Sequence, residues 1–194
     1  MASRAAGLIL AGGAGVRFGG PKAFATLPDG RTFLAAAAEA LGAGGASPIA
    51  VTLPPGAKAT GLKALVAVPL ASPGLPMFES IRAGLGPLLA RPGWDTVVVL
   101  PVDHPLVRPE TVRALGGAGA AAAIPSFRGK HGHPVAIARE VAARIAGGEL
   151  PGPTLREVLH AVGTVVVEVD DAGVTANCNT PAALAAALAA GAPE

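Results

Sequence analysis

The sequence predicts a three-layer α/β/α domain with a Rossmann-like, mostly parallel central sheet. Apolar runs of strand length alternate with segments of helical spacing along the chain, which is typical of βα units. A length of 194 residues suits one domain, and an apolar fraction of 51% suffices to build its core. No linker or repeat breaks the pattern, so we expect residues 1–194 to form a single domain.

Each element of this domain follows from its local pattern. Short apolar runs predict strands at Ala6–Leu10, Ile49–Leu53, Leu65–Val68, Thr96–Leu100, Ala120–Ile124, Pro134–Ile137 and Thr164–Val169. Helical spacing predicts helices at Thr32–Leu41, Met77–Leu89, Pro109–Leu115, Glu140–Ile145, Thr154–Ala161 and Pro181–Ala190. Thr32 and Thr154 suit helix N-caps, and Pro109 and Pro181 suit a first helical turn.

Composition excludes several classes of partner. The net charge is only +2, aromatic residues make up 3% and no basic run occurs, so the electrostatic footprint of a nucleic-acid binder is missing. The single cysteine, Cys178, excludes an internal disulfide and a CxxC zinc pattern, which fits a reducing compartment. The alanine-rich tail AALAAALAAGA is about half the length of a membrane span. We therefore expect a cytoplasmic protein with neither a nucleic-acid nor a membrane partner.

The segment GLILAGGAGVRFGGPK, residues 7–22, places a glycine-rich loop directly after the first expected strand. Backbone N–H groups approach phosphate oxygens closely only where side chains are absent, so such a loop forms a natural phosphate cradle. Arg17 and Lys22 add two cations at its far end, which suits a triphosphate. The alternative is an ordinary strand-to-helix turn, which would require neither cation.

Two familiar phosphate-binding patterns do not fit this loop. The dinucleotide fingerprint G-x-G-x-x-G fails because Gly13, Gly15 and Gly19 have the spacing G-x-G-x-x-x-G. The P-loop fails because Pro21 separates the last glycine from Lys22, and no hydroxyl residue follows. The loop therefore indicates a different class of nucleotide-binding protein.

An isolated carboxylate follows the fourth expected strand. Thr96–Leu100 ends in PVDHP, which places Asp103 at the carboxyl edge of the sheet, where open α/β folds bind ligands. A hard divalent cation that bridges phosphates takes only one or two protein oxygens and keeps water for the rest, so a lone acid is sufficient. We predict that Asp103 is a ligand of Mg²⁺. The alternative is a carboxylate that caps the following turn.

Several segments resemble, in order, the motifs of the MobA-like NTP transferase family, in particular its molybdenum cofactor cytidylyltransferases and guanylyltransferases. They are LAGGAGVRFGGPK, PKAFATLPDGRTFLAAAAEAL, ESIRAGL, VVVLPVDHPLV, GKHGHPVAI and NCNTPAAL, and together they cover roughly Ala6–Leu184. The resemblance implies the fold of the nucleotide-diphospho-sugar transferases and a Mg²⁺-dependent nucleotidyl transfer. In this reaction the terminal phosphate of molybdopterin attacks the α-phosphorus of a nucleoside triphosphate, and pyrophosphate leaves. The nucleophile is already anionic, so no general base is needed.

The resemblance also implies roles for individual residues of the loop and the metal site. The nucleotide-binding residues would be Leu10, Ala11, Gly12, Gly13, Ala14, Gly15, Lys22 and Ser80. Arg17 and Lys22 would neutralise the β and γ phosphates, and Asp103 would hold the metal. Asn177 and Asn179 would complete the metal site at positions where many relatives carry aspartates; an amide oxygen can bind Mg²⁺, but it brings no charge. Turn and helix-start chemistry is the alternative for both asparagines.

The segment HGHPV resembles the element that lines the acceptor side of the cleft in the cytidylyltransferase branch, which implies that His131 and His133 bind the acceptor. Zinc binding is the first alternative, because alternate residues of an extended chain face the same way. It would require a third protein ligand, and neither an HxxxH pattern nor a cysteine pair is present. Two partly exposed turn histidines are the second alternative.

The identity of the nucleotide depends on which motifs are counted. LAGG resembles the guanylyltransferases, whereas GGPK, ESIRAGL, DHPLV and GHPV resemble the cytidylyltransferases, so the motif count favours CTP. The alternatives are guanylyl transfer from GTP, transfer to a sugar phosphate or polyol phosphate, and a non-catalytic domain that carries a cofactor. The resemblance implies molybdopterin as the acceptor and a molybdoenzyme or its maturation factor as a protein partner.

Overall fold

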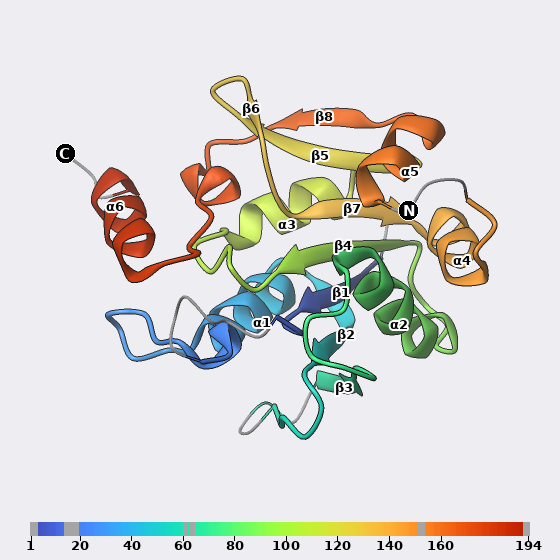
Figure 1. The fold of residues 1–194 in the computed structure, drawn as a ribbon. Helices are drawn as coiled ribbons and strands as arrows, with labels where there is room; N and C mark the ends of the chain where they lie inside the picture. Colours follow the sequence, from blue (N-terminus) through green and yellow to red (C-terminus); the bar gives the residue numbers. More distant parts are fainter. Residues whose placement is uncertain (1–3, 14–19, 60–61, 63–64, 151–153, 192–194) are drawn as a thin grey trace.

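The computed structural model describes residues 4–13, 20–59, 62, 65–150 and 154–191 (Figure 1). The strands are β1 (Ala5–Leu10), β2 (Ala46–Leu53), β3 (Leu65–Pro69), β4 (Thr96–Pro101), β5 (Ala122–Phe127), β6 (Lys130–His131), β7 (Val135–Ala138) and β8 (Val165–Glu168). The α-helices are α1 (Phe33–Ala43), α2 (Met77–Leu89), α3 (Pro109–Gly116), α4 (Arg139–Gly147), α5 (Leu155–Val162) and α6 (Pro181–Gly191). Two short 3₁₀ helices, η2 (Lys22–Phe24) and η3 (Ala172–Thr175), complete the described elements.

The strands form one sheet in the order β3-β2-β1-β4-β7-β5-β6, and β8 pairs with β5. The first four strands run parallel, with β1 paired to β2 and β4, and β2 paired to β3. β8 is parallel to β5. β7 is antiparallel to both β4 and β5, and β6 is antiparallel to β5. The sheet is therefore mostly parallel, as expected from the sequence.

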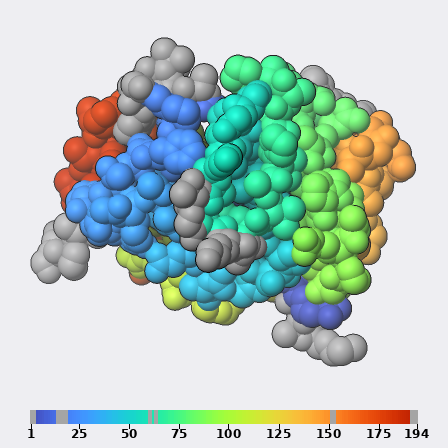
Figure 2. Space-filling model, turned by 90° about the horizontal axis from the view of Figure 1, so that it is seen from below, coloured from blue at the N-terminus to red at the C-terminus, as the bar shows by residue number. Residues whose placement is uncertain are grey.

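Helices cover both faces of this sheet, which confirms the predicted three-layer architecture (Figure 1). Along β1, Ile9 packs in a cluster with buried residues of α1 and α3, whereas Leu8 and Leu10 pack in a cluster with α2, α4 and α5. This alternation follows from the two-residue period of a strand, which points successive side chains to opposite faces. Figure 2 shows the β3 end of the molecule, where α1 (blue) lies beside β2, β3 and α2 (cyan to green).

The local start signals of two helices are present as expected. The side chain of Thr32 accepts a hydrogen bond from the N–H of Ala35 at 3.1 Å, which caps α1. Thr154 and Glu157 form a reciprocal capping box at the start of α5. No described helix is long and apolar enough to cross a membrane.

One departure from the expected elements concerns β5. The sequence predicts a strand at Ala120–Ile124, but β5 extends from Ala122 to Phe127. Pro125 lies inside it, where pairing with Val167 of β8 continues the strand and its carbonyl accepts from Gly132 N at 3.2 Å. Tertiary pairing on both sides thus overrides the local strand-breaking tendency of proline.

Candidate functional site

The carboxyl ends of β1 and β4 meet at one point of the sheet edge. Leu10 and Pro101 are register partners, and Val102 N donates to Leu10 O at 3.0 Å just beyond the strands. Gly12 and Gly13 follow β1 and Asp103 follows β4, so parallel pairing alone brings the glycine loop and the carboxylate together. The chain order reverses between these two strands, which is where open α/β sheets form a ligand crevice.

A cavity of about 230 Å³ occupies this edge. Its lining residues come from β1 and its loop, η2, the start of α2, the loop after β4, and two later segments; they are Leu10, Gly12, Gly13, Lys22, Leu75, Met77, Ser80, Pro101, Val102, Asp103, His104, His133 and Asn177. A Cβ at Gly12 would lie 2.1 Å from Leu70 Cδ1, so a side chain at this position would require the buried Leu70 to shift. We call this space the loop cavity.

The structure brings most of the predicted nucleotide-binding residues to the loop cavity. Leu10, Gly12, Gly13, Lys22 and Ser80 all line it, and the buried Ser80 hydroxyl donates to Pro76 O at 3.4 Å. Ala11 is buried in the core and is not among the lining residues. Ala14, Gly15 and Arg17 lie outside the described residues.

The centre of the site is a convergence of three side chains from distant parts of the chain. Lys22 Nζ lies 3.3 Å from Asp103 Oδ2, and both side chains are about one-fifth exposed. The same ammonium donates to Asn179 Oδ1. A carboxylate oxygen and an amide oxygen thus face one cation, and this is the donor chemistry that Mg²⁺ or Mn²⁺ takes from a protein.

These donors fit a hard divalent cation and do not fit zinc. Asp103 and Asn179 supply two oxygens around a position that already attracts a positive charge, and a phosphate-bridging cation takes its remaining ligands from phosphate and water. Among the described residues, no group of three or more His, Cys, Asp or Glu side chains is arranged to hold a metal ion. The zinc alternative for His131 and His133 therefore has no support in this part of the chain.

The structure separates the two asparagines that the sequence could not distinguish. Asn179 contacts Lys22 beside Asp103, whereas Asn177 lines the loop cavity and a second, adjoining cavity. The backbone of the same segment is attached to the loop that carries Asp103, because Cys178 N donates to Asp103 O at 2.8 Å. Burial, followed by the charge of Asp103, raises the pKa of the Cys178 thiol to about 11, so this cysteine stays a neutral, buried residue.

Asp171 holds the segment that carries these asparagines in place. Its buried carboxylate accepts from Arg108 N at 2.8 Å, Thr111 Oγ1 at 2.6 Å and Gly173 N at 2.9 Å. These bonds join η3 to the start of α3 and satisfy a carboxylate that would otherwise be costly to bury.

A pair of histidines separates the loop cavity from the second cavity. The rings of His104 and His133 lie 4.9 Å apart, His104 Nδ1 lies 3.5 Å from Gly173 O, and His133 Nδ1 is buried without a hydrogen-bond partner in the described part of the chain. Burial lowers the pKa of both rings, and the neighbouring His104 contributes further to lowering that of His133, to about 4. Both rings are therefore neutral near pH 7. His104 was not predicted as a site residue from the sequence, although its place in DHPLV directly after Asp103 was a usable signal.

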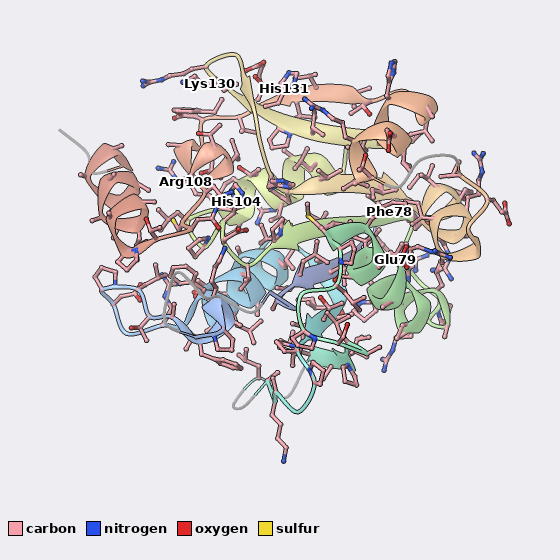
Figure 3. All side chains as sticks on the ribbon, viewed as in Figure 1. Phe78, Glu79, His104, Arg108, Lys130 and His131 are labelled. Carbon is pink, nitrogen blue, oxygen red and sulfur yellow. The ribbon has the colours of Figure 1, made fainter. Side chains whose placement is uncertain are left out.

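His131 lies apart from this pair. It is exposed on β6 (Figure 3). Of the two cavities it lines only the second, whereas His133 lines both. Gly132 between them packs tightly, since a Cβ there would lie 2.0 Å from Val174 O, and His133 N donates to that same oxygen at 2.9 Å.

Comparison with known proteins yields a family match. The family model described as MobA-like NTP transferase domain matches residues 7–165, which agrees with the resemblance of the sequence motifs. No curated protein matches the sequence significantly.

Solved structures share the fold over almost the whole chain. A homologue of Mycobacterium tuberculosis Rv0371c from Mycobacterium sp. strain JC1 is 26% identical over 98% of this chain and 100% of that chain, with a TM-score of 0.77. Rv0371c from M. tuberculosis H37Rv, in complex with manganese, is 23% identical over 96% and 99% of the two chains, with a TM-score of 0.69. Molybdopterin-guanine dinucleotide biosynthesis protein A from Archaeoglobus fulgidus is 22% identical over 93% and 95%, with a TM-score of 0.65. These likenesses confirm the Rossmann-like α/β fold.

Proposed function

The chain belongs to the MobA-like NTP transferase family, and on that premise we propose that it is a CTP:molybdopterin cytidylyltransferase of molybdenum cofactor biosynthesis. Family membership makes it a nucleotidyltransferase that takes a nucleoside triphosphate. One observation carries the assignment of the site: Lys22, Asp103 and Asn179 converge beside the glycine loop at the carboxyl edge of the sheet. A protein that only carried a cofactor would not need this set of charges.

In the proposed site, the triphosphate lies in the loop cavity. Gly12 and Gly13 present backbone to the phosphates, and Lys22 neutralises charge on the β and γ phosphates. The sequence motif assigns the same role to Arg17, which is not among the described residues. Asp103 and Asn179 would hold Mg²⁺, which would offset the negative charge of the phosphates. Ser80 lies at the first turn of α2 as a further nucleotide contact.

The acceptor enters from the side of the second cavity, past His133 and His131. A phosphate oxygen of molybdopterin bonds to the α-phosphorus, the bond from the α-phosphorus to the bridging oxygen breaks, and pyrophosphate leaves with that oxygen. The attacking oxygen is already anionic, so the protein has only to position the two phosphates and stabilise the charge of the leaving group. Because no proton has to be removed from the nucleophile, the neutral rings of His104 and His133 at the junction are needed only for positioning.

The motif count supports CTP, since GGPK, ESIRAGL, DHPLV and GHPV resemble the cytidylyl branch. Guanylyl transfer is the second candidate, supported by LAGG and by the similar fold of a molybdopterin-guanine dinucleotide biosynthesis protein. We propose that residues 1–194 act as one domain in the cytoplasm, and that a molybdoenzyme or its maturation factor receives the product.

Pyrophosphate release from CTP, GTP, ATP and UTP, with Mg²⁺ or Mn²⁺ and with molybdopterin or a panel of sugar and polyol phosphates, tests the proposal. We expect release that requires a divalent cation and molybdopterin and is fastest with CTP. The Lys22→Ala variant controls for contaminating activity, and Lys58→Ala, an exposed lysine outside the described cavities, controls for general loss of charge. If pyrophosphate were released with GTP and with no other nucleotide, GTP would replace CTP as the assigned substrate. Release only with a sugar phosphate would overturn molybdopterin, and nucleotide binding without any release would support a carrier.

A further inference from the structure

The second cavity, of about 610 Å³, adjoins the loop cavity and is the larger of the two. The two cavities share Met77, His104, His133 and Asn177 as a common wall. An acceptor phosphate at this wall would lie next to the Asp103 site, so the body of the acceptor has to extend into the second cavity. The volume suits a sizeable organic group as well as a phosphate.

The lining of the second cavity combines an apolar floor with positive charge. The floor consists of Ile124, Val135, Leu155, Leu159 and Val174. Lys130 and Arg156 are the only lysine and arginine among the lining residues, and no aspartate or glutamate is among them. Lys130 comes from the β5–β6 hairpin (Figure 3), and Arg156 comes from the first turn of α5.

Both cations are available to a ligand. Neither Lys130 nor Arg156 has an ion pair or a side-chain hydrogen bond within the described ranges. The acid nearest to Arg156 in the sequence, Glu157, is committed to the capping box with Thr154, since its Oε2 accepts from Thr154 N at 3.1 Å. An anion in this cavity would therefore meet two unpaired positive charges and no lining carboxylate.

We propose that the second cavity recognises an acceptor whose organic body packs against the apolar floor and which carries a second anionic group, remote from the attacking phosphate, and that Arg156 and Lys130 bind this group. The inference rests on the proposed function for the place of the reacting phosphate, and it deepens that function by naming the class of acceptor. A sugar or polyol phosphate carries hydroxyl groups over its whole length, and those that lie against the apolar floor would lose water without a hydrogen bond from its side chains. The cavity selects against such acceptors for this reason.

Fluorescence titration with pterin-6-carboxylate and with uncharged 6-methylpterin tests the inference, because the two probes share a ring system and differ in one anionic group. Each is titrated into the wild-type protein, Arg156→Gln, Lys130→Gln and the matched control Arg144→Gln, which removes an exposed arginine outside both cavities. We expect wild type to bind the carboxylate probe more tightly than the uncharged probe. Arg156→Gln should lower the affinity for the carboxylate probe about tenfold and the affinity for the uncharged probe less than about twofold. Lys130→Gln should change both affinities in the same direction. Arg144→Gln should change neither.

Equal affinity for the two probes, no binding of either probe, or equal effects of Arg156→Gln and Arg144→Gln would overturn the inference. These outcomes are separable from failure of the proposed function, which is measured by pyrophosphate release. If the enzyme uses a sugar phosphate while the carboxylate probe still binds through Arg156, the acceptor assignment fails and the recognition of a second anion stands. If molybdopterin is the acceptor but Arg156→Gln does not change the affinity for the carboxylate probe, the function stands and the inference fails.

Discussion

The ammonium of Lys22 lies 3.3 Å from the carboxylate of Asp103, and the two residues are 81 positions apart in the chain. Lys22 also donates to Asn179 Oδ1, so it occupies the space between the two oxygens proposed to hold the metal. In the absence of ligands this lysine therefore competes with a divalent cation for the same donors. A triphosphate would draw the ammonium to its own oxygens and release the pair for the metal.

Lys22→Ala should have opposite effects on metal binding and on catalysis. We expect Mn²⁺ to bind the nucleotide-free variant more tightly than wild type, because the competing ammonium is gone. Turnover should fall by about a hundredfold or more, because charge on the leaving pyrophosphate is uncovered. Electron paramagnetic resonance of Mn²⁺ and pyrophosphate release measure the two effects. Weaker Mn²⁺ binding in the variant would show that Lys22 does not compete with the metal.

Asp103→Asn should impair use of the metal more than binding of the nucleotide. In the proposed site the glycine loop and Lys22 would still hold the triphosphate, but the carboxylate proposed to attract the cation would be lost. We expect the Mg²⁺ concentration for half-maximal turnover to rise by about tenfold or more, with a smaller change in the affinity for CTP. An unchanged magnesium titration would make Asp103 a turn residue only.

The two asparagines should respond differently to the same substitutions. Asn179→Asp places a second negative charge beside Asp103 and should tighten Mn²⁺ binding to the nucleotide-free protein, and Asn179→Ala should lower turnover. Asn177→Asp and Asn177→Ala are the matched controls two positions away, and their effect on metal affinity should be smaller. Calorimetry of metal binding and turnover assays decide the matter. Equal responses at both positions would contradict the assignment of Asn179.

His133 should make the stability of the fold dependent on pH below neutrality. Burial and the neighbouring His104 lower its pKa from 6.5 to about 4 in the folded state, so between these values the unfolded chain binds a proton that the folded chain does not. The free energy of unfolding therefore falls as the pH drops from about 6.5 to about 4, by at most about 3 kcal/mol. Below about pH 4 this group makes no further contribution to the pH dependence.

Urea unfolding of wild type and His133→Gln from pH 7.5 to 4 measures this effect. The variant should show a shallower loss of unfolding free energy across the window, and the exposed His131→Gln control should follow wild type. Parallel curves for wild type and His133→Gln would contradict the prediction.

Local patterns in the sequence predicted most of the fold. The alternation of apolar runs and helical spacing located the main strands and α-helices to within a few residues, because strand and helix periods are properties of the local chain. Gly12, Gly13 and Asp103 could be assigned to one edge of the sheet without coordinates, since parallel strands end on the same side. The antiparallel direction of β7 and the extension of β5 were not predictable in this way, because both depend on which strands become neighbours.

The sequence by itself therefore determined the layers of the domain, the glycine loop and the carboxylate at the strand ends. Only the tertiary structure decided that Lys22 meets Asn179, 157 positions away, and that Asn177 faces the cavities instead. It alone joined His104 to His133 and formed the second cavity between β5, β6, α5 and η3. The physical reason is that such contacts depend on long-range attachments, such as the bonds of the buried Asp171 carboxylate that hold η3 against α3, and no local periodicity encodes these attachments.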